Sequence, residues 1–394
     1  MMRALIVIDK LWTGGVTTSL INYLNYVVQY MDVDLLVFNL NKGDDLLVPS
    51  EVNIINGSKT LKLLGSPQAD LFRSNVVLAI CRAFFVFVSK CFSGHIARKI
   101  LFFFTKKLGS YDLAISYTHD VSWKSLTTGC NDFVISRVKA NYKAAFVHCD
   151  FQNYGGYSPQ VLTIYDKFDS ILCVSDGCKK SFLKCFPSLS SNVITCENFT
   201  NINIIKEKSS PSKKFKRGRF NIVTVCRIDN EKGIFRALNA LKKLYEEGFT
   251  QISWRIVGDG PDLDRLKREI SAFNLENVVE LCGLQNNPYP FINGASLFLL
   301  PSFHEAAPMV FGESQVLKVP ILTTETTSAY DMVYNRKIGF VCPNSEDGIY
   351  HYLKMILNKQ IVLPLISDDL ANMVNNNAIK DFNRFLNIVK AHGR

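Results

Sequence analysis

Short apolar segments alternate with helix-like segments along most of this chain of 394 residues. Several of these segments are apolar at nearly every position, which is typical of parallel strands that are covered on both faces. The predicted strands are Ala4–Ile8, Val33–Phe38, Leu113–Ser116, Ala144–His148, Ser170–Val174, Ile222–Cys226, Ser253–Val257, Val278–Leu281, Ser296–Leu300 and Pro320–Thr323. Strand–helix repetition of this kind predicts the α/β class, with doubly wound domains built on parallel sheets.

The chain is too long for one ordinary hydrophobic core, so two domains are expected. A polar, basic segment with Pro and Gly at residues 206–219 indicates a linker. A nuclear-localisation or nucleic-acid-binding patch is the alternative for this segment. We therefore predict a first domain over residues 1–205 and a second over 220–375. Residues 376–394 are expected to form a helix that packs back on the first domain.

Composition and charge narrow the class of protein. Lys and Arg number 45 against 35 Asp and Glu, which gives a net charge of +10 and favours anionic partners such as nucleotide phosphates or anionic lipid. Eleven cysteines without repeated spacing indicate reduced thiols of a cytosolic protein. The first apolar run is too short for a signal peptide and meets Asp9 at once. A cytoplasmic protein is therefore expected.

The segment Leu71–Gly109 contains seven Lys and Arg residues, many interleaved phenylalanines and no acidic residue. Its most apolar part, Val76–Val88, is interrupted by Arg82 and is shorter than the roughly 20 residues that a membrane-spanning helix needs. One interpretation is a basic, aromatic surface that lies on an anionic bilayer. The other is a pair of ordinary helices whose phenylalanines fill the core of the first domain.

Charged and glycine residues follow two predicted strands of the second half. Arg227 and Lys232 stand between a strand end and a helix start, where two cations can bind a diphosphate if their side chains converge. Gly258 and Gly260 allow a tight turn in which the backbone approaches a ligand. Leu263 occupies the place of the third glycine in the dinucleotide-binding fingerprint, so a dehydrogenase is disfavoured.

Two glutamates follow the predicted strand Ser296–Leu300. Glu305 lies in the loop after this strand, and Glu313 lies in the next predicted helix. Carboxylates at such an edge of a parallel sheet suit hydroxyl-rich ligands such as a sugar and a ribose. The alternative is a helix-terminal acid and a solvated helix acid. The acids of Asp262–Asp264 begin a helix and are expected to cap it, so no metal ligand is predicted.

Several short motifs occur along the chain in a specific order. They are Gly14-Gly15 after the first strand, Val147-His148, Cys173-Val-Ser175, Asn198, Arg227 with Lys232, Gly258-Asp-Gly-Pro261, and Glu305 with Glu313. This ordered set resembles the glycosyltransferase 4 family of the GT-B fold, whose members are retaining enzymes that use nucleotide-sugar donors. The resemblance covers nearly the whole chain and is strongest between Asn221 and Thr324.

The resemblance implies two Rossmann-like doubly wound domains that face each other across a cleft, with a UDP- or GDP-linked donor held mainly by the second. Arg227 and Lys232 would hold the diphosphate, Glu305 the transferred sugar and Glu313 the ribose. Together with His148, which would lie near the reacting sugar, Arg227, Lys232 and Glu305 form the expected catalytic set. A satisfied core histidine is the alternative for His148. The expected donor-binding residues are Gly14, Gly15, Asn198, Arg227, Lys232, Gly258, Gly260, Glu305, Ala306, Ala307, Pro308, Met309, Val310 and Glu313.

The chain departs from the family pattern at two places. The family often has Glu-Gly-x-Pro where this chain has Glu305-Ala-Ala-Pro308, and Ala306 would be strained if its position needed a positive φ. Residues 326–331, Thr-Thr-Ser-Ala-Tyr-Asp, replace the usual Gly-Gly before a further acid. This second departure leaves the identity of the donor sugar open.

The expected activity is therefore transfer of a hexose-type sugar, with retention, to a hydroxyl of a saccharide acceptor in bacterial cell-surface polysaccharide biosynthesis, such as capsule or lipopolysaccharide. A lipid-linked acceptor would place the protein as a peripheral protein on the inner face of the cytoplasmic membrane. No cofactor, metal or nucleic acid is expected, because basic side chains and amide groups would neutralise the leaving diphosphate. A nucleotide-sugar epimerase of GT-B fold and a non-catalytic, transferase-like scaffold subunit are the alternatives.

Overall fold

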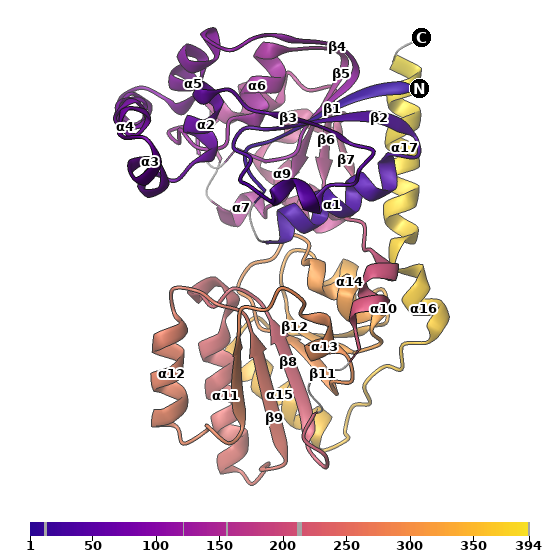
Figure 1. Ribbon diagram of the computed structural model, residues 1–394. Coiled ribbons are helices and arrows are strands. Elements are labelled where there is room, and N and C mark those ends of the chain that lie inside the picture. The colour runs from indigo at the N-terminus through magenta and orange to yellow at the C-terminus, as the bar shows by residue number, and fades with distance from the viewer. Residues whose placement is uncertain (12–13, 121, 155–156, 211–214, 393–394) are drawn as a thin grey trace. The chain divides into compact units, whose positions relative to one another are not determined.

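The computed structural model describes residues 1–11, 14–120, 122–154, 157–210 and 215–392 (Figure 1). The chain divides into two compact units, of which the first comprises Met1–Phe199 with Asn377–Arg394 and the second Thr200–Asn376. The division falls before the predicted linker at 206–219, because that segment begins inside helix α10 (Ile202–Lys208), which packs against α14 (Met309–Val316) of the second unit. Residues 211–214 of the predicted linker lie outside the described residues.

The first unit contains a seven-stranded parallel sheet in the order β3-β2-β1-β4-β5-β6-β7. Its strands are β1 (Met2–Ile8), β2 (Met31–Val37), β3 (Asn53–Asn56), β4 (Leu108–Ser116), β5 (Val138–Val147), β6 (Ser170–Cys173) and β7 (Val193–Thr195). Its helices are α1 (Gly15–Val27), η1 (Asp44–Leu47), α2 (Lys59–Gly65), α3 (Gln68–Ser74), α4 (Val76–Cys91), α5 (Gly94–Phe103), α6 (Cys130–Arg137), α7 (Phe151–Tyr154), α8 (Pro159–Tyr165), α9 (Asp176–Cys185), η2 (Pro187–Leu189) and α17 (Asn376–His392). The strand order reverses between β1 and β4, and β1 is buried along Ala4–Ile8.

Helix α17 joins the first unit from the far end of the chain. Phe382 packs edge-on against Tyr23 and Tyr26 of α1, with ring centroids 6.1 and 5.4 Å away. The backbone N–H of Glu197 donates to Asp381 at 3.3 Å. Aromatic pairs of this kind add to the free energy gained from burying apolar area. The final helix is therefore part of the core of the first unit.

The second unit contains a six-stranded parallel sheet in the order β10-β9-β8-β11-β12-β13. Its strands are β8 (Phe220–Val225), β9 (Ile252–Val257), β10 (Val279–Gly283), β11 (Leu297–Leu300), β12 (Ile321–Thr324) and β13 (Gly339–Cys342). Its helices are α10, η3 (Asn230–Lys232), α11 (Ile234–Glu246), α12 (Leu263–Ala272), α13 (Tyr289–Ile292), α14 (Met309–Val316), η4 (Tyr330–Tyr334), α15 (Glu346–Leu357), α16 (Asp368–Asn372) and η5 (Met373–Asn375). Each face of this sheet has its own buried apolar cluster, one around Trp254 and Leu238 and the other around Phe298 and Phe311.

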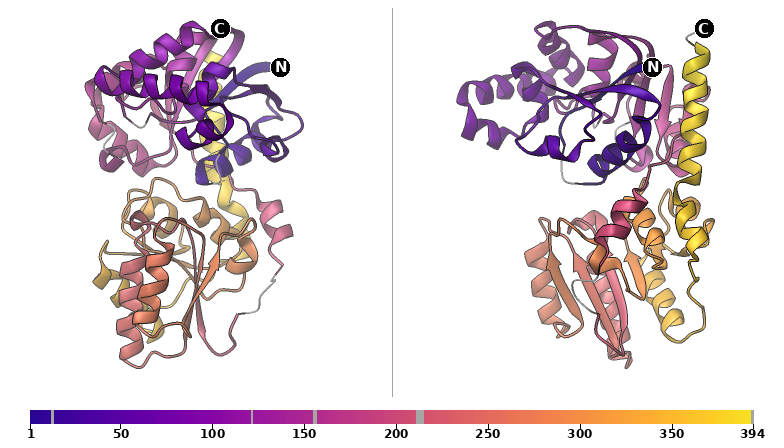
Figure 2. Two further views of the ribbon diagram at one scale, coloured as in Figure 1. Left: turned by 60° about the vertical axis from the view of Figure 1, so that its left-hand side comes forward. Right: turned by 45° about the vertical axis from the view of Figure 1, so that its right-hand side comes forward.

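Two further views show helices on both sides of each sheet (Figure 2). The prediction of two Rossmann-like doubly wound domains is confirmed, and each of the ten predicted strands overlaps a strand of the structure. The expected cleft between the domains stays a prediction. Within the described part of the chain, every helix is too short or too polar to span a bilayer.

Candidate functional site

The predicted site residues of the second unit lie where its strand order reverses. Arg227 and Lys232 follow the carboxyl end of β8, and Glu305 follows the carboxyl end of its neighbour β11. Loops on either side of such a reversal diverge to opposite faces of the sheet and leave a crevice between them, which is where open α/β sheets bind ligands. The structure therefore places these three residues at the edge of the sheet that the sequence indicated.

Lys232 and Glu305 form an ion pair, with the lysine Nζ 2.7 Å from the glutamate Oε1. The Ser302 hydroxyl donates to the same oxygen at 2.7 Å. The side chains are 25% and 11% exposed, respectively. Burial alone would lower the pKa of Lys232, but the charge and hydrogen bond of Glu305 outweigh it and leave that pKa raised. The lysine therefore stays a cation, and Glu305 is held in one orientation.

The loop between β8 and α11 presents Lys232 through a tight turn. The Asp229 carboxylate caps this turn by accepting from the Lys232 backbone N–H at 3.2 Å. Gly233 has φ of 64°, and a Cβ there would lie 2.0 Å from the Pro301 carbonyl oxygen. Glycine is thus required both by its conformation and by the close approach of the β11 loop. This contact brings the loops of Lys232 and Glu305 together.

Arg236 of α11 anchors the loop that carries Glu305, and the sequence interpretation did not include it. Its guanidinium donates to the Pro301 carbonyl oxygen at 2.9 and 2.6 Å and to the Ser302 carbonyl oxygen at 2.8 Å. It also lies over the Phe303 ring, 3.8 Å from the centroid. Burial lowers the pKa of Arg236 to about 10. The sequence signal that could have identified Arg236 is its position on the apolar face of α11, next to Ile234 and Ala237.

Arg227 has a different environment from Lys232. Its guanidinium pairs with the Asp229 carboxylate at 2.5 Å, while its side chain remains 67% exposed. The Asp229 carboxylate therefore accepts from the Arg227 guanidinium and also from the Lys232 backbone N–H. The Lys232 side chain pairs with Glu305 instead, so the side chains of the two cations have different partners. An exposed guanidinium of this kind can turn towards a phosphate with little change in the surrounding fold.

The two glycines after β9 pack against the Arg227 loop. A Cβ at Gly258 would lie 1.8 Å from the Cys226 carbonyl oxygen, and one at Gly260 would lie 2.2 Å from the Ile228 carbonyl oxygen. The Ile228 N–H donates to the Asp259 carbonyl oxygen at 2.9 Å. The close approach that these glycines permit in the structure is therefore to protein backbone. Their predicted contact with the donor stays a prediction.

Glu313 lies on the buried side of α14 and is only 7% exposed. Burial raises the pKa of its carboxyl to about 7. Among the described residues, its Oε2 has no hydrogen-bond partner. This environment excludes the alternative of a solvated helix acid. A buried carboxyl with an unused oxygen suits a ligand that brings hydroxyl groups.

The segment between Glu305 and α14 holds the remaining predicted donor-binding residues. Ala306 and Ala307 precede Pro308, which is the N-cap residue of α14, and Met309 and Val310 begin its first turn. The described non-glycine residues with positive φ are Thr128, Asn274, Lys318, Lys337 and Lys359. Ala306 is therefore free of the strain considered for it. The first turn of a helix has backbone N–H groups that suit an anion.

The loop after β12 contributes two buried hydroxyl groups that the sequence interpretation did not assign. Thr326 is 8% exposed and Ser328 is fully buried. In the described part of the chain, neither hydroxyl has a hydrogen-bond partner. These residues lie in the segment that departs from the family pattern. They add two hydrogen-bonding groups near the carboxyl edge of the same sheet.

In the first unit, His148 follows β5 and stacks on Phe146, with ring centroids 5.3 Å apart. Burial lowers its pKa to about 3, with a further contribution from His119, whose own pKa burial lowers to about 4. Both imidazoles are thus neutral near pH 7. Among the described residues, His148 Nε2 and His119 Nδ1 are buried without a hydrogen-bond partner. Both interpretations of His148, a core histidine and a residue near the reacting sugar, stay predictions.

A hydroxyl network connects other predicted residues of the first unit. Gly14 caps α1 through its carbonyl oxygen, which accepts from the Thr18 N–H, and Gly15 is the first helical residue. The Ser19 hydroxyl donates to Asn198 Oδ1 at 2.6 Å and lies 2.8 Å from the Tyr117 hydroxyl. Helix α1 is thereby tied to the segments that follow β4 and β7. The roles of Gly14, Gly15, Asn198 and His148 towards a donor stay predictions.

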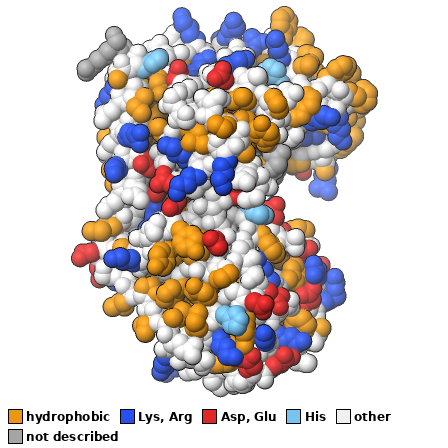
Figure 3. All heavy atoms as spheres, turned by 180° about the vertical axis from the view of Figure 1, so that it is seen from behind, with side chains coloured by type: hydrophobic (Ala, Val, Ile, Leu, Met, Phe, Trp, Pro, Cys, Tyr) orange, Lys and Arg blue, Asp and Glu red, His pale blue; other side chains and the backbone are white. Residues whose placement is uncertain are grey.

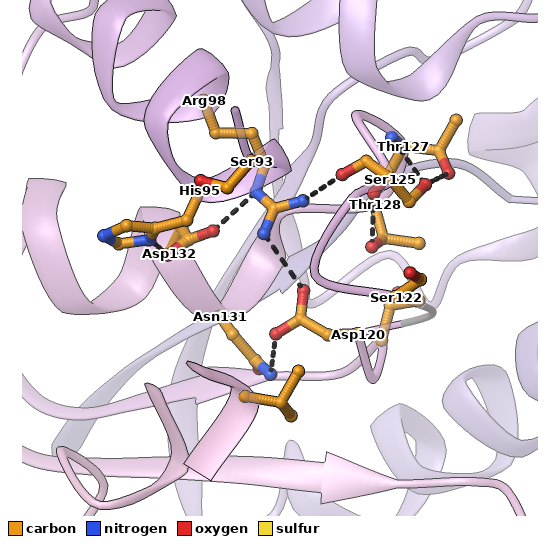
Figure 4. A network of polar contacts seen from close by, with 12 residues as sticks. Ser93, His95, Arg98, Asp120, Ser122, Ser125, Thr127, Thr128, Asn131 and Asp132 are labelled. Carbon is orange, nitrogen blue, oxygen red and sulfur yellow. Dashed lines mark hydrogen bonds and ion pairs between the residues drawn. The ribbon is translucent and has the colours of Figure 1, made fainter. Parts of the chain in front are cut away.

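A buried charge network holds the loop that follows β4 (Figure 4). Arg98 of α5 donates to Asp132 at 2.5 Å and to the Ser125 carbonyl oxygen at 2.6 Å, and it lies 3.7 Å from Asp120. His95 contacts the other oxygen of Asp132. Burial alone would raise the pKa of Asp132, but Arg98 and His95 lower it. Arg98, which the sequence suggested as part of a basic surface, is therefore an internal residue that positions this loop.

No group of three or more His, Cys, Asp or Glu side chains in the described ranges is arranged as metal ligands would be. At the edge of the second sheet the described residues offer cations at Lys232 and Arg227 and carboxyl groups at Glu305 and Glu313. This combination suits a ligand that carries both phosphate and hydroxyl groups.

Two Rossmann-like units with such an edge site define the GT-B class of protein. Solved structures of this class match the fold over nearly the whole chain. HepE from Anabaena in complex with UDP and glucose has a TM-score of 0.68 at 15% identity, covering 99% of this chain and 100% of that one. The lipopolysaccharide outer core galactosyltransferase WaaB, in its apo form, has a TM-score of 0.60 at 17% identity and covers 96% of this chain and 99% of that one.

Sequence comparison gives a match to a family over part of the chain. Residues 205–381 match the family model for glycosyl transferases group 1. This confirms the resemblance drawn from the motifs over that part of the chain. An uncharacterized glycosyltransferase of Methanocaldococcus jannaschii is 27% identical over 180 residues, which cover 43% of this chain and 44% of the relative.

Two bacterial relatives also match parts of this chain. The putative colanic acid biosynthesis glycosyltransferase WcaL of Escherichia coli is 29% identical over 32% of each chain. The capsular polysaccharide biosynthesis glycosyltransferase CapM of Staphylococcus aureus is 25% identical over 55% of this chain and 57% of its own. The chain thus matches about a third to a little over half of the length of these relatives.

Proposed function

We propose that the protein is a retaining glycosyltransferase that moves a hexose from a UDP- or GDP-linked donor to a hydroxyl of a saccharide acceptor. The observation that carries this proposal is the Lys232–Glu305 pair at the strand reversal of a group 1 glycosyltransferase domain. A cation and a hydroxyl-binding carboxylate in contact match the diphosphate and the sugar of such a donor. The solved structures of HepE with UDP, UDP-glucose, and UDP and glucose support a uridine donor.

In the proposed reaction the acceptor oxygen bonds to the anomeric carbon on the face from which the diphosphate leaves. The bond between this carbon and the diphosphate oxygen breaks, and the acceptor proton passes to the departing diphosphate. Lys232 and Arg227 neutralise the charge that develops on the leaving group, and Glu305 orients the sugar hydroxyls. No divalent metal is needed for this step, because the two cations supply the neutralising charge.

We further propose that the acceptor is a lipid-linked saccharide of cell-surface polysaccharide biosynthesis in a bacterium, handled on the inner face of the cytoplasmic membrane. The names of CapM and WcaL support the pathway class. A Campylobacter jejuni relative, 26% identical over 49% of this chain, is named for transfer to a saccharide on diphospho-undecaprenol. That name supports a lipid-linked acceptor for this chain.

A thermal-shift screen over UDP- and GDP-sugars tests donor binding, because a ligand that binds only the folded state stabilises it by mass action. We expect one nucleotide-sugar class to raise Tm in the wild-type protein but not in Lys232→Ala. Incubation of that donor with saccharide acceptors should then give a product whose anomeric configuration, read by NMR, equals that of the donor.

The same assays separate the alternatives. Interconversion of the nucleotide sugar without any acceptor would show an epimerase. Donor binding without transfer to any lipid-linked or free saccharide would show a non-catalytic scaffold. An inverted product would contradict retention while leaving the donor site in place.

A further inference from the structure

Helix α4 of the first unit turns its phenylalanines outward and its arginine inward. Phe84 and Phe87 are 59% and 64% exposed, whereas Arg82 is 8% exposed. Arg82 donates from Nε to the Leu63 carbonyl oxygen at 3.1 Å and from Nη1 to Gln68 Oε1 at 2.9 Å. A helix on the surface of a domain in water normally has the opposite orientation. The buried arginine fixes α4 in this orientation.

The exposed apolar side chains continue over the neighbouring helices, and we call this surface the outward face of α3–α5. On α4 they recur at spacings of three and four residues, which is one face of a helix. The outward face comprises Phe72, Val77, Ile80, Phe84, Phe87, Phe92, Ile96, Ile100, Phe103 and Phe104. Phe102, by contrast, is buried, so the core-filling alternative holds for that phenylalanine but not for these.

The packing of the helices makes this face continuous. Helix α3 packs against α4 and α4 against α5, and the rings of Phe103 and Phe104 contact each other with centroids 5.5 Å apart. Seen from behind, hydrophobic side chains gather at the upper right, over α3–α5, with Lys and Arg beside them (Figure 3). Contiguous exposed apolar patches mark interaction sites.

The charge of the face identifies the kind of partner. Exposed cations lie within or beside the apolar side chains, namely Arg73, Lys90, Lys99, Lys106 and Lys107. Between Leu71 and Gly109 the chain has no acidic residue, and Asp70 and Asp112 are the nearest acids along the sequence. Phenylalanines next to lysines match the acyl boundary and the anionic headgroups of a bilayer at the same time.

We propose that the outward face of α3–α5 binds the surface of an anionic lipid bilayer. The phenylalanines enter the boundary between headgroups and acyl chains, and the lysines and Arg73 contact lipid phosphates. Helix α4, with 16 residues, lies in the plane of the surface, because a spanning helix needs about 20. This inference rests on the proposed place at the cytoplasmic membrane and deepens it by naming the surface that binds, which uses none of the residues assigned to the donor.

Vesicle flotation of the full chain tests the proposal. Vesicles of phosphatidylglycerol with phosphatidylcholine, and vesicles of phosphatidylcholine alone, are compared at about 0.1 M salt, where surface charges act over about 10 Å. We expect the protein to float with the anionic vesicles and to stay largely unbound with the neutral ones. Raising the salt should release it in part.

Variants locate the contact. Phe84→Ser combined with Phe87→Ser and Phe103→Ser should weaken binding by at least about tenfold, because three apolar anchors are lost. Lys99→Glu with Lys106→Glu and Lys107→Glu should abolish the preference for anionic vesicles. The matched control is Leu46→Ser with Val362→Ser and Leu365→Ser, which removes exposed apolar side chains elsewhere and should leave binding unchanged.

The protein's Tm and its stabilisation by UDP should be the same in all these variants, which separates loss of membrane binding from loss of the fold or of the donor site. Failure of the wild type to float with anionic vesicles would overturn the proposal. An equal loss of binding in the control variant would also overturn it. A wild-type dimer that the phenylalanine variant converts to a monomer, by analytical ultracentrifugation, would show instead a contact between two copies.

Discussion

The Nζ atom of Lys232 lies 2.7 Å from Oε1 of Glu305, although the two residues follow different strands and are separated by 73 positions in the sequence. The pair keeps a cation and a carboxylate side by side before any ligand arrives. For the proposed diphosphate-sugar donor, this contact would hold both groups in place in advance, and preorganised groups of this kind stabilise developing charge.

Replacement of either member of this pair should impair turnover. We expect Lys232→Ala and Glu305→Ala each to lower kcat/KM by at least about tenfold, or about 1.4 kcal/mol of transition-state stabilisation. The double variant should lose less than the sum, because the side chains contact each other. Lys267→Ala, which removes an exposed pair with Asp264, serves as the control. Steady-state kinetics with near-wild-type values in both single variants would contradict the site assignment.

The stability of the protein should depend on pH through Glu313. Its folded pKa of about 7 lies above the usual 4.5, so folding favours the protonated form. This contribution is complete below about pH 4.5 and is lost as the pH rises through 7, by up to about 3 kcal/mol. Glu313→Gln should flatten that part of the pH profile in calorimetric unfolding. Glu246→Gln, at an exposed position of the same unit, should leave it unchanged.

Arg236 should act as a positioning residue for Glu305. In Arg236→Met the carbonyl oxygens of Pro301 and Ser302 lose their donor, which should destabilise the second unit by about 2 to 4 kcal/mol. Arg236→Lys should recover part of the stability but less of the turnover, because an ammonium cannot reproduce the planar set of donors. Thermal unfolding and kcat are measured on both variants. Equal recovery of stability and turnover in the lysine variant would show that only the charge matters.

Glycine at position 258 should be required for space as well as for conformation. Gly258→Ala places a Cβ against the Cys226 carbonyl oxygen, so we expect a loss of several kcal/mol in stability and of UDP binding. Gly248→Ala is the matched control, because Gly248 also has positive φ but open space around it. That variant should cost only about 1 kcal/mol. Similar losses in both variants would exclude the steric role of Gly258.

Removal of divalent metals should have little effect on transfer. With Lys232 and Arg227 neutralising the diphosphate, excess chelator is expected to change kcat by less than about twofold. The control is the same assay after added Mg²⁺. Activity that disappears with the chelator and returns with Mg²⁺ would refute the proposal of a metal-independent enzyme.

The sequence predicted the strands that matter most for the fold. Buried central strands such as Ala4–Ile8 are continuous apolar runs in the sequence. Such runs are the pattern by which the sequence analysis predicted strands. The strands that were not predicted are β3, β7 and β13, which have three or four residues and lie at or next to the sheet edges. Short segments such as Val193–Thr195 carry too little pattern to separate a strand from a loop.

The sequence analysis named Lys232 and Glu305, which the structure brings into contact, but it missed the buried arginines that position loops. The roles of Lys232 and Glu305 towards a ligand stay predictions. Glu305 and Lys232 belong to ordered motifs along the chain. Arg236 and Arg98 instead make their contacts across 65 and 34 positions of the sequence, and no local spacing records such a pairing. Their signal is indirect, since each is a charge placed on the apolar side of a helix. Buried arginines of this kind are therefore worth seeking when a loop has to be positioned.

The packing of α17 on α1 has a consequence for how the protein is made. The second unit is one uninterrupted segment, Thr200–Asn376, whereas the first needs residues from both ends of the chain. During synthesis the second unit can thus fold as soon as it emerges from the ribosome. The rings of Tyr23 and Tyr26 gain their contact with Phe382 only after α17 has been synthesised. A chain that stalls before α17 would therefore leave the rings of Tyr23 and Tyr26 without the cover that Phe382 gives them.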